Sequence, residues 1–160
     1  MFRVEQRSPR LGFGGDVREI TPTIVGRMLR EELIPVIAPV GVDDDGQAYN
    51  VNADTVAGAM AEALDAEKLV YLTDVAGVYG DWPDESSLIS RVDVDGLEKL
   101  SADGKAPEGM IPKPESCVSA VRNDVRRAHI HAGRPPPALL LPVCTRCDAG
   151  CMGGAHGQSP

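Results

Sequence analysis

Apolar residues in the first third of the chain follow a helical period and then a strand period. Thr21-Pro22 suits a helix start, because threonine can cap a helix and proline fits its first turn. Five apolar residues then recur at helical spacing: Ile24, Val25, Met28, Leu29 and Leu33. The run from Ile34 to Val42 predicts a strand despite its two prolines. Asp43–Gly46 predicts a turn, and Gln47–Val51 predicts a second strand that pairs back on the first.

The middle and later parts of the chain alternate in a similar way. The pattern predicts helices over Ala53–Ala66, Val92–Leu100 and Pro112–Val125, and strands over Lys68–Thr73 and Ala128–His131. The basic, glycine-rich residues 1–15 and the proline- and glycine-rich tail 142–160 are predicted to be irregular. Strands that alternate with helices indicate an α/β fold whose sheet is parallel or mixed.

Composition narrows the classes of function. The 160 residues are 42% apolar and 25% charged, which is typical of a globular domain with its own core. The formal net charge of −8 argues against non-specific nucleic-acid binding, which needs a basic footprint. No apolar run approaches the roughly 20 residues that span a bilayer, and the start of the chain lacks a signal-peptide core. We therefore expect a cytoplasmic protein with no membrane or nucleic-acid partner.

Polar residues gather where a predicted strand meets a predicted helix. Asn50 and Asn52 are two residues apart, so in an extended strand their amides lie on the same face. Two amides on one face suit recognition of a carboxylate or amide on a small ligand. Asp54 has a simpler interpretation from spacing alone, as a carboxylate in the first turn of a helix, where the positive end of the helix dipole favours it.

Two further segments are candidates for nucleotide or phosphate binding. Asp74 and Gly77 follow the apolar run Lys68–Thr73, and ligands of α/β folds gather at the carboxyl ends of strands. Lys113 lies in the first turn of a predicted helix, where the dipole disfavours a cation. A phosphate bound at that helix end would explain the lysine, whereas an ordinary surface loop and a solvated lysine remain the alternatives.

Metal ligation has weak support in the sequence. The segment Asp43–Gly46 resembles a calcium loop, but aligning it puts Gly41 at the first position and Asn52 at the twelfth, so the bidentate glutamate is absent. Cys144, Cys147 and Cys151 with His156 offer soft ligands for zinc, although their spacing departs from standard zinc modules. We therefore assign no metal site and leave a zinc-binding tail as an alternative.

An ordered series of motifs resembles the acetylglutamate kinases, a group within the amino-acid kinase superfamily. The motifs cover about residues 12–141 and read GDVREITP, LIPVIAPVGVDDDGQAYNVNADTVAGAMAEAL, AEKLVYLTDVAGVY, SLIS, GMIPKPESCVSAV and RAHIHAGR. The resemblance is to the second half of such a chain. It implies a three-layer αβα sandwich with a mainly parallel sheet, in which residues 16–141 form the nucleotide-binding lobe.

The resemblance also implies an activity and the residues that carry it. The reaction would transfer the γ-phosphoryl group of ATP, carried with Mg²⁺, to the side-chain carboxylate of N-acetyl-L-glutamate in arginine biosynthesis. Asn50, with Asn52, would bind acetylglutamate, Asp54 would orient the catalytic lysines, and Lys113 would stabilise the transferred phosphoryl group. The implied nucleotide-binding residues are Thr73, Asp74, Gly77 and Met110.

A second hypothesis is a non-catalytic module for nucleotide binding or subunit interaction. The chain contains no Lys-x-Gly-Gly loop, which the resembled family carries in its first half. A chain that forms part of such a fold leaves a sheet edge and an apolar face uncovered. We therefore expect homo-oligomers or other self-association under either hypothesis.

Overall fold

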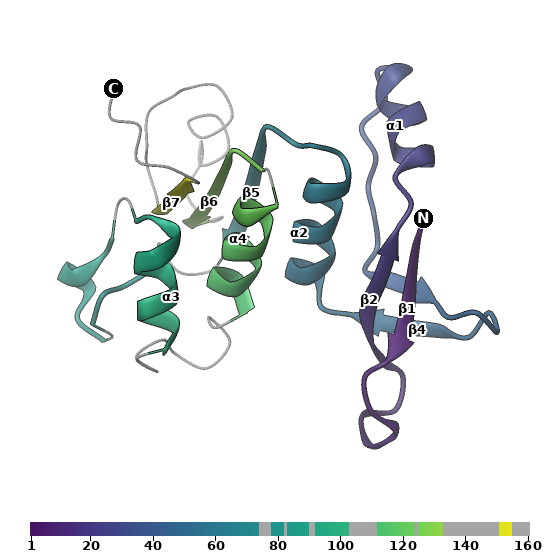
Figure 1. The fold of residues 1–160 in the computed structure, drawn as a ribbon, viewed down its shortest axis with the longest axis horizontal. Coiled ribbons are helices and arrows are strands. Elements are labelled where there is room, and N and C mark those ends of the chain that lie inside the picture. The colour runs from purple at the N-terminus through teal and green to yellow at the C-terminus, as the bar shows by residue number, and fades with distance from the viewer. Residues whose placement is uncertain are drawn as a thin grey trace. The chain divides into compact units, whose positions relative to one another are not determined.

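The computed structural model describes residues 1–73, 78–81, 83–89, 92–102, 112–123, 125–132 and 151–154. The chain divides into two compact units, Met1–Leu64 and Asp65–Pro160, which are taken separately below (Figure 1). This boundary falls near the end of the second predicted helix, Ala53–Ala66.

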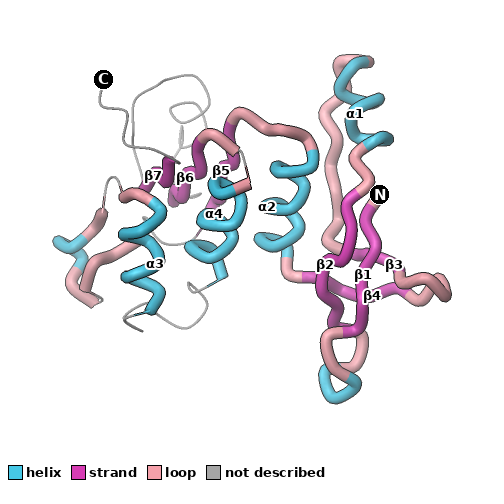
Figure 2. The backbone as a smooth tube through the Cα atoms, viewed as in Figure 1, coloured by secondary structure: helices cyan, strands magenta, loops and turns pink. Residues whose placement is uncertain are grey.

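Met1–Leu64 contains four strands that close into a ring. Its elements are β1 (Phe2–Gln6), the 3-10 turn η1 (Pro9–Leu11), β2 (Gly14–Ile20), α1 (Thr23–Arg30), β3 (Val40–Val42), β4 (Ala48–Val51) and α2 (Ala53–Ala63). The order around the ring is β1-β2-β4-β3 (Figure 2). β1 with β2 and β3 with β4 are antiparallel hairpins. Two short parallel seams join the hairpins, β1 to β3 and β2 to β4.

The prediction of irregular structure for residues 1–15 was wrong. Phe2 and Val4 alternate with exposed residues along β1 and are buried, as expected for a strand with one inward face. They form a core with Tyr49, Val51 and Val56. The alternation covers only two apolar residues, so the pairing with β2 identifies β1 as a strand more clearly than its own composition does.

Two glycines let the ring close. A Cβ on Gly41 would lie 2.3 Å from Val4 Cγ1 and 2.8 Å from two atoms of the Phe2 ring. A Cβ on Gly15 would lie 2.9 Å from Tyr49 Cβ. Real Cβ atoms do not approach so closely, so only the missing side chain lets the strands and the core side chains share this space.

Helix α1 starts later than the sequence predicts. The backbone N–H of Thr21 donates to the Met1 carbonyl at 2.8 Å, which keeps Thr21 beside β1 rather than at the helix cap. Pro22 occupies the N-cap position and makes no side-chain capping bond. Of the predicted apolar stripe only Val25 is buried, whereas Ile24 and Leu29 are exposed.

The predicted strand over Ile34–Val42 is a strand only at Val40–Val42. Pro35 and Pro39 lack an N–H donor, and within the described residues no neighbouring strand runs beside 34–37. The turn at Asp43–Gly46 and the return strand, β4, are confirmed. Gly46 has a φ of 83°, a left-handed conformation that glycine adopts without strain.

Asp65–Pro160 contains a three-stranded sheet with helices. Its described elements are β5 (Lys68–Thr73), the 3-10 turn η2 (Glu85–Ser87), α3 (Val94–Ala102), α4 (Pro112–Arg122), β6 (Arg127–Ala132) and β7 (Cys151–Gly154), with strand order β5-β6-β7. Cys117 and Val121 on α4 are buried, Val118 is half-buried, and Val125 is buried although it follows the end of the helix at Arg122. Tyr71 and Ile130 contribute the inward faces of the two strands.

The tail is not wholly irregular, because β7 pairs antiparallel with β6. An unpaired β6 would present a row of bare N–H and C=O groups at the sheet edge, and Cys151–Gly154 supplies their partners. β5 and β6 are parallel, so both units have mixed sheets rather than the predicted mainly parallel one. The α/β class itself is confirmed.

An exposed ion pair closes the β1–β2 hairpin. Arg7 Nε donates to Asp16 Oδ1 at 2.8 Å, and a second guanidinium nitrogen contacts the same oxygen. This hydrogen bond holds the pKa of Asp16 below its usual range. The two side chains are 50% and 40% exposed, so the pair stabilises the fold by at most about 1 kcal/mol.

Gly41→Ala is expected to destabilise the ring, because the added methyl group must displace Val4 or Phe2. Overpacking of this kind typically costs about 1–3 kcal/mol. The control is Gly26→Ala in α1, where the nearest atom to the new Cβ, Arg30 Nη1, is 3.7 Å away. That helix-interior change should stabilise by roughly 0.5–1 kcal/mol. Urea denaturation measures both, and equal effects would contradict the packing argument.

Asp16→Asn is expected to reduce stability at pH 7 by a few tenths to about 1 kcal/mol. Because the folded pKa of Asp16 is lowered, its contribution is present above the unfolded value near 4 and is lost as pH falls through the folded value. The variant and the parent should therefore converge in urea denaturation at about pH 2. A difference that persists unchanged at that pH would show that the carboxylate charge is not responsible.

Candidate functional site

Asn50 lies at the carboxyl end of β4 and is exposed. Its backbone N–H donates to the carbonyl of Phe13 at 2.8 Å, and it pairs with Val40 in β3 and Gly14 in β2. Hydrogen bonds on both sides hold this backbone in the ring, so the amide side chain projects from a fixed position. A rigid support of this kind suits a binding residue, and the role of Asn50 in ligand recognition stays a prediction.

Asn52 is outside the strand and caps the next helix. β4 ends at Val51, and Asn52 is the N-cap of α2 with φ −62° and ψ 126°. Its Oδ1 accepts from the backbone N–H of Thr55 at 3.1 Å, which satisfies one of the helix's otherwise unbonded N–H groups. The amide oxygen thus has a local structural task that the two-residue spacing did not reveal.

Asp54 is the second residue of α2 and is half-buried. The simpler interpretation from sequence, a carboxylate in the first turn of a helix, is confirmed. Because β4 leads into α2 through Asn52 alone, the three polar residues Asn50, Asn52 and Asp54 lie within one short strand-to-helix corner. We call these three residues the acceptor corner.

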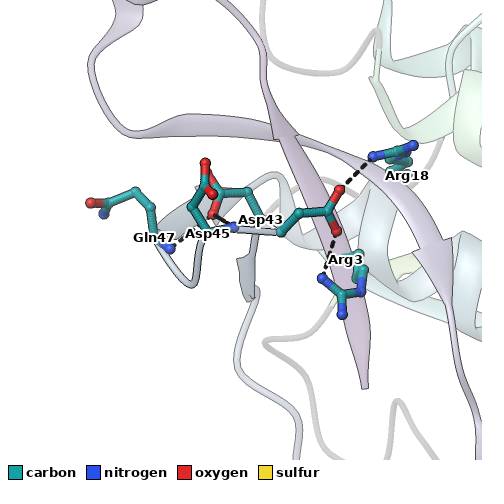
Figure 3. A network of polar contacts seen from close by, with 6 residues as sticks. Arg3, Arg18, Asp43, Asp45 and Gln47 are labelled. Atoms are coloured by element: carbon teal, nitrogen blue, oxygen red, sulfur yellow. Dashed lines mark hydrogen bonds and ion pairs between the residues drawn. The ribbon is translucent and has the colours of Figure 1, made fainter.

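The acidic turn beside β4 is organised by its own hydrogen bonds. Asp43 Oδ1 accepts from the backbone N–H groups of Asp45 and Gln47 at 3.0 and 2.9 Å. Asp44 lies between Arg3 and Arg18, with N–O distances of 2.6 and 3.1 Å (Figure 3). In the described ranges there is no group of three His, Cys, Asp or Glu side chains that could hold a metal ion.

Tyr49 connects this turn to the acceptor corner. Burial raises the pKa of Tyr49, and a hydrogen bond with Asp43 and the charges of Asp43 and Asp45 raise it further. The phenol therefore remains neutral at ordinary pH and serves as a core residue with a polar tip.

In Asp65–Pro160, Thr73 and the start of α4 lie at the same end of the sheet. Thr73 is the last residue of β5 and pairs with Ala132, the last residue of the parallel strand β6. α4 leads into β6 through residues 123–126, so it runs back along the sheet and begins at the carboxyl end of the strands (Figure 1). Lys113, the second residue of α4, is placed at this end by the helix backbone.

That end of the sheet is a candidate anion site. The N-terminal turn of the eleven-residue α4 offers backbone N–H groups and the positive end of a helix dipole. Ligands of α/β folds bind beyond the carboxyl ends of the strands. We call Thr73 and Lys113 the nucleotide edge. Asp74, Gly77 and Met110 lie outside the described residues, as do Cys144, Cys147 and His156.

Sequence reasoning missed the segment that flanks Asn50. Phe13 supplies the carbonyl that holds the Asn50 backbone, and its exposed ring contacts the ring of Tyr49 with centroids 6.2 Å apart. Gly14 and Gly15 then pair with Asn50 and Val51. The available signal was an aromatic residue followed by two glycines, because glycines within a strand mark close backbone approach. The signal was not used, because residues 1–15 were predicted to be irregular.

The family model described as "Amino acid kinase family" matches residues 2–131. The chain belongs to the amino acid kinase family. Among its relatives, the acetylglutamate kinase of Saccharopolyspora erythraea is 50% identical over 149 residues, which cover 93% of this chain and 48% of that protein. The chloroplastic acetylglutamate kinase of Arabidopsis thaliana is 46% identical over 145 residues, which cover 91% of this chain and 42% of that protein.

Solved structures agree on the fold. An N-acetylglutamate synthase from Neisseria gonorrhoeae matches 91% of this chain and 33% of its own with a TM-score of 0.82 and 25% identity. The protein smu.665 from Streptococcus mutans matches 97% and 57% with a TM-score of 0.81 and 26% identity. A carbamate kinase from Giardia lamblia, at 17% identity and a TM-score of 0.68, shares the α/β kinase fold. The chain spans about half the length of the curated relatives it matches.

Asn52→Ala is expected to destabilise α2 by about 1 kcal/mol, because Thr55 N–H loses its acceptor. Asn52→Asp should retain the cap, since aspartate is an equally good N-cap residue. Urea denaturation of both variants measures the cap, and calorimetric titration with N-acetyl-L-glutamate measures binding separately. Weakened binding in the Asp variant at parental stability would indicate a direct ligand contact, whereas parental binding would leave Asn52 a structural residue only.

Proposed function

We propose that this chain is part of an acetylglutamate kinase. The observation that carries the proposal is the identity of about 50% to enzymes of that name over more than nine-tenths of the chain. The candidate residues that the structure describes, Asn50, Asn52, Asp54, Thr73 and Lys113, lie at strand ends and helix starts, where α/β folds bind ligands. The whole enzyme would adopt a three-layer αβα sandwich, with residues 16–141 serving as its nucleotide-binding lobe and 142–160 as an atypical tail.

The reaction proposed is phosphoryl transfer to a carboxylate, the step that commits N-acetyl-L-glutamate to arginine biosynthesis. A side-chain carboxylate oxygen of acetylglutamate bonds to the γ-phosphorus of ATP. The bond from that phosphorus to the β–γ bridging oxygen breaks, and ADP leaves with its electrons. The product is an acyl phosphate, and no proton needs to be removed from the ionised acceptor.

The main obstacle is the repulsion between two anions, the acceptor carboxylate and the triphosphate. Phosphoryl transfer depends on positioning and on positive charge rather than on covalent help from the protein. At the nucleotide edge, the first turn of α4 and the ammonium of Lys113 would stabilise the charge on the transferred group. Mg²⁺ would arrive with ATP, since phosphates and water supply much of its coordination.

The acceptor corner would hold the other substrate. Asn50 would bind acetylglutamate from its fixed position at the end of β4. Asn52 would contact acetylglutamate while it also caps α2. Asp54 would hold the catalytic lysines in position without acting as a base. Thr73, with Asp74, Gly77 and Met110, would contact the nucleotide.

The alternative is a nucleotide-binding or subunit-interaction module without turnover. It is motivated by the chain's coverage of only about half of its relatives and by the lack of a Lys-x-Gly-Gly loop. Calorimetry that detects ATP binding, together with no transfer of labelled phosphate to acetylglutamate, would select this alternative. A chain that does not bind ATP would contradict both functions.

Lys113→Ala is expected to lower phosphoryl transfer by about 10²–10³-fold, the usual cost of removing one group that stabilises transition-state charge. The assay follows labelled γ-phosphate from ATP to N-acetyl-L-glutamate. Lys99→Ala is the matched control, because it removes the same charge from the exposed face of α3. Parental activity in the Lys113 variant would remove that residue from the reaction.

A further inference from the structure

One peptide unit in the β3–β4 hairpin is placed for a reaction within the chain. Asp45 and Gly46 lie at the tip of this hairpin, and both are exposed. The carboxyl group of an aspartate is open to attack by the backbone nitrogen of the next residue, which closes a five-membered ring. Glycine in the next position favours the attack, because it has no Cβ beside that nitrogen and permits backbone rotations that other residues resist.

The backbone around the Gly46 nitrogen has room to turn. The N–H of Gly46 donates to the Asp43 carbonyl at 3.3 Å, which is longer than the usual range of about 2.7–3.2 Å. A Cβ built on Gly46 would meet no atom within 4 Å. The nitrogen can therefore turn toward the Asp45 carboxyl group once this one long hydrogen bond opens.

A second Asp–Gly pair provides a comparison within the same chain. Asp95 and Gly96 lie in the first turn of α3, where the N–H of Gly96 donates to Asp93 Oδ1 at 2.8 Å. A Cβ on Gly96 would lie 2.7 Å from Val92 Cγ2. The next residue, Leu97, is buried, and its N–H donates to the Asp93 carbonyl at 3.0 Å. Turning the Gly96 nitrogen toward Asp95 therefore requires the first turn of the helix to open.

We propose that Asp45–Gly46 is a modification site at which the folded protein converts aspartate to isoaspartate. The Gly46 nitrogen bonds to Asp45 Cγ, and the amide proton leaves with the carboxyl hydroxyl group as water. Water then adds to the main-chain carbonyl carbon of Asp45, and the bond from that carbon to the Gly46 nitrogen breaks. The main chain now runs through Cβ and Cγ, and the former main-chain carbonyl is a free carboxylate.

The product no longer fits the native turn, because it has one more main-chain atom between residues 45 and 46. Asp43 Oδ1 accepts from the N–H groups of Asp45 and Gln47 at 3.0 and 2.9 Å, one on each side of the inserted atom (Figure 3). The N–H of Asp43 also donates to the Gln47 carbonyl at 3.0 Å. We therefore expect the modification to loosen the tip of the hairpin. This inference does not depend on the proposed kinase function.

The test measures isoaspartate at each Asp–Gly pair of the folded chain. The protein is incubated at mildly acidic pH and elevated temperature, digested with trypsin, and analysed by electron-transfer fragmentation, which distinguishes isoaspartate from aspartate. A third pair, Asp103–Gly104, lies outside the described residues. Cleavage after lysine and arginine places the three pairs in separate peptides, residues 31–68, 92–99 and 100–105.

Isoaspartate should accumulate in the peptide 31–68 at least about tenfold faster than in 92–99, because α3 must open locally before its pair reacts. In concentrated urea the ratio of the two rates should fall to near one, since both pairs then lie in unfolded chain. A ratio near one in the folded protein would overturn the inference.

Asp45→Glu should abolish the isoaspartate in 31–68, because it keeps the charge but would require a six-membered ring, which forms much more slowly. The side chain is exposed, so thermal denaturation should change little. Asp95→Glu is the matched control and should leave the rate in 31–68 unchanged. Isoaspartate in 31–68 that persists in the Asp45 variant would assign the reaction to another residue and overturn the proposal.

The loosening of the turn has a separate measurement. In the modified protein, hydrogen exchange at the Gln47 N–H should be at least about tenfold faster than in the fresh protein. Exchange at Leu97 in α3 should stay unchanged, which excludes general unfolding during the incubation. An unchanged rate at Gln47 would contradict the expected effect on the hairpin.

Discussion

Everything in Met1–Leu64 depends on how closely the strands of the small ring approach one another. Gly41 lies against Phe2 and Val4, and Gly15 lies against Tyr49, at distances that no side chain would permit. This approach brings β2 beside β4 and allows Phe13 to hold the backbone of Asn50. Backbone packing therefore determines the position of the acceptor corner. The residues that hold its polar side chains in place have no proposed role in the reaction.

Asp65–Pro160 obtains its nucleotide edge by a different means. Two parallel strands in register bring their carboxyl ends together, and the helix that returns between them must begin at that same end. The position of Lys113 thus follows from connectivity. β7 then pairs with the far side of β6 and supplies partners for its backbone, which explains why a stretch rich in glycine forms a strand at all.

The sequence predicted correctly those elements whose structure depends on the spacing of apolar residues within the element itself. Lys68–Thr73 is a strand over the expected residues, and the α2 and α4 helices begin at the expected residues, because apolar spacing and cap residues act within one element. The failures at residues 1–15 and 151–154 share a cause, since both strands owe their state to partners distant in the chain. Asn52 does not share the strand of Asn50, because it lies just after β4 and caps α2, and spacing alone does not distinguish these two positions.

The ring has a further consequence for how the chain folds. Its two antiparallel hairpins are local in sequence, whereas the parallel seams join residues 35 or more positions apart through one or two residue pairs. Hairpins form in microseconds, and distant pairings follow only after loop entropy has been overcome. We therefore expect each hairpin to form first and the seams to close last. The corner that carries Asn50 is completed in that last step, so it reaches its native geometry only when the ring closes.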